Sequence, residues 1–236
     1  TFAHRAGQST YRDRTGGPWL GISGRWVWRE GQMLSADLSA GGAGHVTILE
    51  GAPLSDPRTA FLRVAGTWQR TLSPAPGITL AAGWGYLADR EVMDWHHGGE
   101  RWHWERTVSA LTATAGATLA MAPGHRLLLS IALSPWATWQ ESTRAVDDES
   151  GAERRWRPAA APATLARVGG SWRYPLGSRW QIGLWFEAFF AGSPPIDRHE
   201  QAYTGPAGNT ETQVVYALPA VDQRAYAYGA MLQALF

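Results

Sequence analysis

Apolar and polar side chains alternate along most of this chain, which is the pattern of β-strands rather than of helices. The last thirteen residues, 224–236, show it most clearly, because Phe236, Leu232 and Tyr228 share one face and smaller residues occupy the other. A strand of this length can cross a bilayer when tilted, since about 9–11 residues are needed. The same alternation predicts strands at 19–29, 59–70, 78–88, 104–121, 126–140, 164–174 and 180–191.

The connections between these strands are alternately short and long. Short Pro- and Gly-containing turns fall at 74–77, 122–125 and 175–178. Long polar segments fall at 89–103, 141–161 and 192–222. Transmembrane barrels have this asymmetry, with short periplasmic turns and long extracellular loops. We therefore predict an all-β fold, a closed antiparallel transmembrane β-barrel, because closure satisfies every backbone group in lipid.

The number of strands depends on residues 30–57. This segment contains QMLSADLS and HVTILE, and it is punctuated by glycines and prolines. Each of the two is shorter than a full span, so eight strands are favoured, and ten result if the segment is a spanning hairpin. Residues 1–17 are expected to be a periplasmic lead-in, and residues 18–236 a single barrel domain.

Composition supports a membrane location. Only 17% of residues are charged, the net charge is +1, cysteine is absent, and 14 residues are Trp. This charge balance does not favour a nucleic-acid partner.

We expect an exported protein of the outer membrane with its signal peptide removed. Aromatic residues near strand ends are expected to form two belts at the membrane interfaces: Trp68, Tyr86, Trp104, Trp139, Trp172, Trp180 and Phe236.

Charged residues also occur at inward positions of the predicted strands: Arg25, Arg63, Arg167 and Glu187. Side chains fill the interior of an eight-stranded barrel, and charges there must be paired or hydrated. They predict an ion network that plugs the barrel, with a narrow ion path as the alternative.

Two polar segments carry candidate chemistry. The segment 89–105 holds Asp94, His96, His97, Glu100, His103 and Glu105. Such residues can bind Zn²⁺ or Cu²⁺, but we interpret the segment as a solvated loop and assign no metal or cofactor. In 141–158, Arg154, Arg155 and Arg157 could contact lipopolysaccharide phosphates, or be part of a solvated loop.

Several local motifs resemble those of the omptins, outer-membrane endopeptidases of Gram-negative bacteria. They are Ala81-Ala82-Gly83-Trp84, an acidic residue before Trp95, the GSWRY stretch at 170–174 and the Asp-x-His-x-x-x-Tyr stretch at 197–203. The resemblance implies that an aspartate pair in one loop and an Asp–His pair in another activate a water.

By this resemblance, Asp197 would orient His199 as general base, because a carboxylate fixes the imidazole tautomer and raises its basicity. Asp94 would match one member of the aspartate pair. Val92 stands two positions before Asp94, so Asp89 or Glu91 would have to replace the other aspartate.

The sequence thus leaves three functions open. The first is a structural or interaction barrel that presents its loops to lipopolysaccharide or to a protein partner. The second is an omptin-like surface hydrolase, and the third is a narrow channel. Expected partners are outer-membrane lipid, lipopolysaccharide and the outer-membrane barrel assembly machinery, and no nucleic acid.

Overall fold

A computed structural model describes residues 2–6, 9–13, 19–29, 31–43, 55–121, 124–158, 161–193, 196–204, 208–218 and 221–234. No helix within these ranges is long and apolar enough to cross a membrane. They form strands β1 (Phe2–Ala6), β2 (Ser9–Asp13), β3 (Trp19–Arg29), β4 (Gln32–Ala43), β5 (Ser55–Ala75), β6 (Ile78–His97), β7 (Glu100–Ala120), β8 (Arg126–Asp147), β9 (Glu153–Pro158), β10 (Ala161–Leu176), β11 (Trp180–Ser193), β12 (Ile196–Thr204), β13 (Thr210–Leu218) and β14 (Val221–Ala234).

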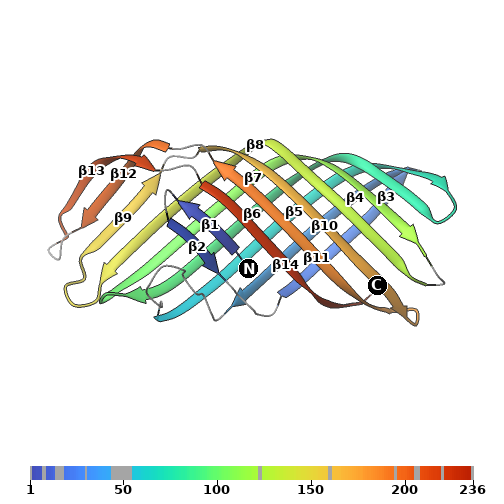
Figure 1. Cartoon of the computed structure of the whole chain (residues 1–236), viewed down its shortest axis with the longest axis horizontal. Helices are drawn as coiled ribbons and strands as arrows, with labels where there is room; N and C mark the ends of the chain where they lie inside the picture. The colour runs from blue at the N-terminus through green and yellow to red at the C-terminus, as the bar shows by residue number, and fades with distance from the viewer. Residues whose placement is uncertain are drawn as a thin grey trace.

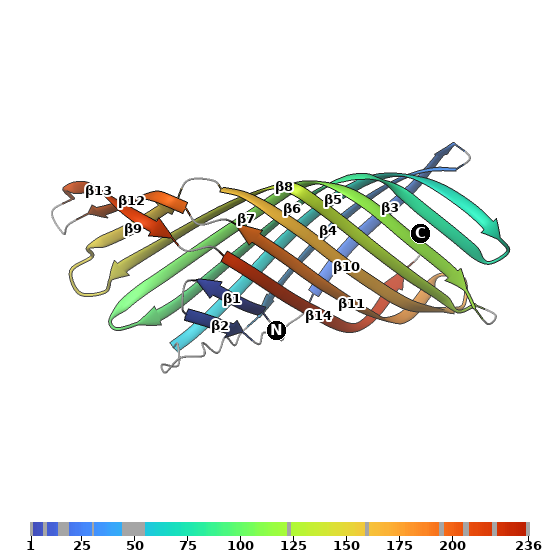
Figure 2. The same ribbon diagram turned by 45° about the horizontal axis from the view of Figure 1, so that its top comes forward.

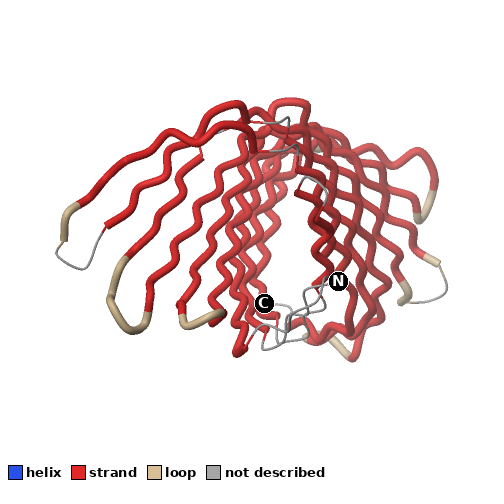
Figure 3. The backbone as a smooth tube through the Cα atoms, turned by 60° about the vertical axis from the view of Figure 1, so that its left-hand side comes forward, coloured by secondary structure: helices blue, strands red, loops and turns tan. Residues whose placement is uncertain are grey.

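The strands form one antiparallel sheet. Its order is β2-β1-β14-β11-β10-β8-β7-β6-β5-β4-β3, and β9, β12 and β13 branch from the far end of β8. Figure 1 shows the long strands running diagonally, with β9, β12 and β13 together at one end. After a 45° turn, the same three strands still project beyond the rest (Figure 2). The sheet curls into an arch, so that one face becomes an inner face (Figure 3).

The turns at one end of the sheet are tight. Gly31, Gly77, Gly124 and Gly177 lie there with φ between 71° and 85°, a region that glycine adopts without steric cost. The main-chain amide of Met121 donates to the carbonyl of His125 at 3.0 Å in one of these turns. We call this end of the sheet the short-turn end.

The opposite end is longer than the sequence pattern indicated. The segments 89–103 and 141–161, expected as loops, largely continue β6, β7 and β8 as paired strands of 20–22 residues. Because a tilted span needs about 9–11 residues, these strands extend well past one bilayer. Within 192–222, β12 and β13 form a further hairpin. We call β6–β9, β12 and β13 at this end the hairpin sheet.

Strand β4 corrects the interpretation of residues 30–57. It has 12 residues and pairs over its length with both β3 and β5. Gly41 and Gly42 do not end the strand, because their backbones pair with Phe61 and Ala60. The eight-strand count, which left this segment out of the sheet, therefore omits a strand. Residues 2–6 and 9–13, in the expected lead-in, form β1 and β2.

Outward and inward positions alternate as predicted. Leu80, Trp84 and Tyr86 on β6 are 43–64% exposed, whereas Leu87, on the opposite face of the same strand, is 3% exposed. On β14, Tyr228 and Leu232 are likewise exposed at 84% and 66%. Of the expected belt residues, Trp68, Tyr86 and Trp180 are exposed, Trp172 is half-buried, and Phe236 lies outside the described residues.

Trp139 and Trp104 do not belong to these belts. Trp139 is 1% exposed and belongs to the core. The reason is a β-bulge: the pairing of β8 shifts between Leu133 and Ala137 against β7, and an extra residue reverses the face of everything after it. Trp136 takes the outward position at 78% exposure. Trp104 alternates in phase with the buried Arg106 and also faces inward.

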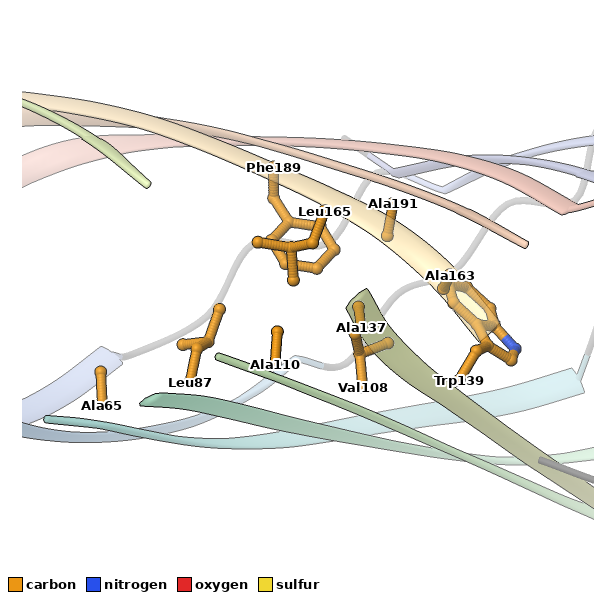
Figure 4. Close-up of a cluster of buried hydrophobic side chains, with 10 residues drawn as sticks. All are labelled: Ala65, Leu87, Val108, Ala110, Ala137, Trp139, Ala163, Leu165, Phe189 and Ala191. Carbon is orange, nitrogen blue, oxygen red and sulfur yellow. The ribbon is translucent and has the colours of Figure 1, made fainter. Parts of the chain in front are cut away.

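The core lies on the inner face. Figure 4 shows its ten side chains, among them Leu87, Val108, Trp139, Leu165 and Phe189, converging from several strands. Phe189 and Leu165 lie on β11 and β10, and Leu87 and Val108 on β6 and β7. The curled sheet therefore packs its two sides against each other across the inner face.

Candidate functional site

Four charged side chains, those of Arg63, Asp89, Arg167 and Glu187, form the centre of the inner face. The Nε and Nη2 atoms of Arg63 donate to Oδ2 of Asp89 at 2.8 and 2.6 Å. Its Nη1 atom donates to Oε1 of Glu187, whose Oε2 accepts a hydrogen bond from Nη2 of Arg167 at 2.6 Å. Asp89 is 4% and Arg63 8% exposed, so these are buried ion pairs.

This network joins distant strands. Arg63 lies on β5 and Glu187 on β11, which are separated in the sheet by β6, β7, β8 and β10. Their contact crosses the inner face. Arg63, Arg167 and Glu187 were predicted to form an ion network, and the structure brings all three together. Arg25, the fourth residue, pairs in register with Ser35 on the same face and acts electrostatically on Asp37.

Arg106 extends the network toward the hairpin sheet. It is 2% exposed, and its Nη2 atom lies 2.8 Å from Oε2 of Glu91 and 3.2 Å from Oδ1 of Asp89. Its guanidinium lies 5.3 Å from the ring centroid of Trp139 and 6.0 Å from that of Phe189. This is the range of cation–π attraction. The Nε and Nη1 atoms have no hydrogen-bond partner among the described atoms.

Glu141 is a further acidic side chain on the inner face, next to Trp104 and Trp139. Its Oε1 accepts a hydrogen bond from Nε1 of Trp104 at 2.7 Å, and its Oε2 accepts one from Nε1 of Trp139 at 3.2 Å. Indole N–H groups commonly find such a partner when buried. This contact satisfies the indole N–H groups of both inward-facing tryptophans.

The sequence named Asp89 and Glu91 only as replacements for the aspartate missing at Val92. It did not single out Arg106 or Glu141. The signal was present for the first two, because Asp89 and Glu91 share the phase of the buried Leu87. For Arg106, the phase was equally readable from Val108 and Ala110, but its partners lie on other strands. For Glu141, the bulge in β8 hid the phase.

Asp94 lies elsewhere. It is on the outer face of β6, and its Oδ1 is 2.7 Å from Nδ1 of His103. Their side chains are 57% and 42% exposed. Asp89 and Glu91, two residues apart and both buried, are the carboxylate pair that β6 points inward.

Strand β12 carries Asp197 and His199, whose side chains lie outside the described residues. The backbone of His199 pairs with Pro158 on β9 and with Val215 on β13. From β6 to β12 the sheet order runs through β7, β8 and β9. Four spacings of about 4.8 Å separate the two strands by roughly 19 Å along the curled sheet.

The candidate metal ligands of 89–105 lie on paired strands instead of a loop. Asp94 and His103 face outward, whereas Glu100 contacts Arg154 beside the inward Trp102. Alternation along the strands therefore separates Glu100 from Asp94 and His103, which share the outer face. Within the described part of the chain, no three such residues are grouped to hold a metal ion.

The arginines of 153–158 have carboxylate partners where their side chains are described. Arg154 contacts Glu100, and Arg155 contacts Glu153, which also lies 3.1 Å from Arg144. The hydrogen bond from Arg155 lowers the pKa of the Glu153 carboxyl, with Arg144 adding to the effect. These pairs leave little unbalanced positive charge on the described part of this segment.

The structure resembles a solved outer-membrane barrel. No protein-family model matches the chain, and no curated protein matches it either. Among solved structures, the outer membrane protease OmpT from Escherichia coli matches with a TM-score of 0.71 and 9% identity, over 99% of this chain and 92% of that chain. At this identity the match shows a shared fold, that of an outer-membrane β-barrel.

Proposed function

We propose that the chain forms a closed ten-stranded barrel in the outer membrane. The edges of the curled sheet are β2 and β3, and only residues 14–18 connect them. An all-antiparallel ring needs an even number of strands. A ring of ten strands meets this condition if β1 lies between β14 and β3. Strand β2 and the branch of β9, β12 and β13 are then not part of the ring. Closure removes the open edges, which cannot face lipid.

The barrel acts as a structural or interaction protein that presents the hairpin sheet to lipopolysaccharide or to a protein partner. The observation that carries this proposal is the Arg63–Glu187 contact across the inner face, with the core around Trp139 and Phe189 beside it. Such packing leaves the interior filled by side chains. Function then falls to the hairpin sheet, where cross-strand ion pairs hold long strands beyond the bilayer.

Pull-down on the folded protein tests the interaction role. Full-length protein in detergent, folded as judged by a heat-modifiable gel band, is incubated with lipopolysaccharide and with solubilised outer-membrane proteins. Retention that is lost when residues 148–152 and 205–209 are masked by bulky tags supports the proposal. Retention unchanged by both tags, or none at all, contradicts it.

A surface hydrolase is the second candidate. Two observations favour it: the inward Asp89 and Glu91 pair beside Arg106, and the OmpT-like fold. In this arrangement Asp89 and Glu91 take the place that the omptin resemblance gave to an aspartate pair, with His199 as base. Peptide-library cleavage in the presence of lipopolysaccharide should be lost in Glu91→Gln and His199→Ala but kept in the outward control Asp94→Asn. Absence of cleavage by the folded wild type would reject this candidate.

A further inference from the structure

Toward the short-turn end, the inner face carries more arginines than acids. Arg25 on β3, Arg126 on β8 and Arg173 on β10 share this face. Asp37 is the one acid among the described inner-face residues between the Arg63–Glu187 contact and the short turns. In the other half of the inner face the acids have cationic partners, because Asp89, Glu91 and Glu187 pair with Arg63, Arg106 and Arg167.

Two of these arginines are directly opposed. Arg173 pairs in register with Arg126 on the neighbouring strand. Opposed side chains have Cβ atoms about 4.5–5.5 Å apart, and like charges in such positions destabilise a sheet. Arg25 and Arg126 both act electrostatically on Arg173, and Asp37 opposes them. The carboxylate of Asp37 is thus shared among Arg167, Arg25 and Arg173, and Arg126 is not one of these three.

The hydrogen-bond partners of Arg173 are neutral. Its Nε atom donates to Oγ of Ser171 at 3.1 Å, and its Nη1 atom donates to Oε1 of Gln233 at 3.2 Å. These bonds orient the side chain without offsetting its charge. The surrounding inner face is polar, as the Ser35–Thr67 hydroxyl pair at 2.5 Å shows. This part of the inner face therefore differs from the apolar core.

We propose that Arg25, Arg126 and Arg173 form a binding site for an oxyanion group, a phosphate or a carboxylate, at the short-turn end of the inner face. Guanidinium groups match the geometry of such anions and bind them with charge-assisted hydrogen bonds. A bound anion converts the repulsion between Arg126 and Arg173 into a shared attraction. This inference is separate from the interaction role of the hairpin sheet, at the opposite end.

Titration of inorganic phosphate into the folded full-length protein tests the site. Isothermal titration in detergent at constant ionic strength compares wild type with Arg173→Gln, Arg126→Gln and the outward control Arg90→Gln. We expect at least tenfold weaker binding in the first two variants and unchanged binding in the control. In phosphate-free buffer, Arg126→Gln should unfold at the same or a higher temperature than wild type, because it removes a like charge. This second readout separates lost binding from lost folding.

The same variants in micelles doped with an anionic phospholipid identify the source of the anion. A rise in unfolding temperature with free phosphate, lost in Arg173→Gln and Arg126→Gln, assigns a soluble anion. A rise with lipid alone, lost in the same variants, assigns a headgroup. No rise with either, or a rise that persists in both variants, overturns the proposal.

Discussion

Buried and exposed arginines on neighbouring strands differ in how much their ion pairs contribute to the stability of the fold. Arg106 is 2% exposed and is the cation nearest Glu91. Arg90 is on the outer face, where its pair with Glu105 at 2.8 Å is more than half exposed on the arginine side. Removing one partner of a buried pair leaves an uncompensated charge, whereas a surface pair contributes little.

Replacing Arg106 with Met should therefore destabilise the folded protein by about 3–5 kcal/mol. The matched change Arg90→Met should cost less than about 1 kcal/mol. Urea unfolding in lipid vesicles, followed by the heat-modifiable gel band, measures both. Equal costs for the two variants would show that Glu91 does not depend on Arg106.

The Glu153 carboxyl gives the hairpin sheet a pH dependence. Its pKa is lowered in the folded protein by the hydrogen bond from Arg155. A lowered pKa contributes stability that is present above the ordinary Glu value and lost as the pH falls through the lowered value. Pepsin should consequently nick the β8–β9 hairpin increasingly as the pH falls below about 4.3, and Glu153→Gln should flatten this dependence. A dependence that survives Glu153→Gln would assign it to another group.

At the scale of the strands, the bulge in β8 decides which tryptophan is structural. Ser134 accepts a hydrogen bond from the main-chain amide of Trp136 at 3.2 Å, and the phase reverses across Pro135. Trp139 then packs in the core, while Trp136 is 78% exposed.

We expect Trp139→Ala to cost about 3–5 kcal/mol of folding free energy, the usual range for a buried tryptophan. Trp136→Ala should cost markedly less, because its side chain leaves no cavity in the core. The two midpoints of unfolding in lipid vesicles give the comparison. A larger loss for Trp136→Ala would place the phase reversal elsewhere in β8.

The strands were predictable where one face meets lipid and the other meets the core. There the period of two is strict, as along 78–88 and 224–234, and the outer-membrane barrel fold followed. The prediction was wrong where this constraint ends. In 89–103 apolar residues such as Val92 and Met93 fall on both faces, so there was no alternation to mark a strand. Trp139 was misplaced because only Pro135 marks the bulge. The network partners of Arg106 lie far away in the chain, and no local pattern reports such pairing.

At the scale of the whole molecule, the inner face is divided along its length. A layer of buried core side chains and the contacts of Arg63, Asp89 and Glu187 join its two sides. Arg25, Arg126 and Arg173 lie on the short-turn side of this layer. Glu91 and Glu141 lie on the other side. A filled layer between two polar halves leaves the hairpin sheet as the surface available for partners.

Single-channel recording in planar bilayers tests the filled interior most directly. Protein shown to be folded by its heat-modifiable band is inserted, and the current is recorded at constant voltage for wild type and for a variant with Arg63, Asp89 and Glu187 all changed to Ser. We predict no conductance steps for the wild type and steps for the variant, because removing the contact across the inner face opens a water path. Regular conductance steps from the wild type would contradict the account and assign the protein to the channels.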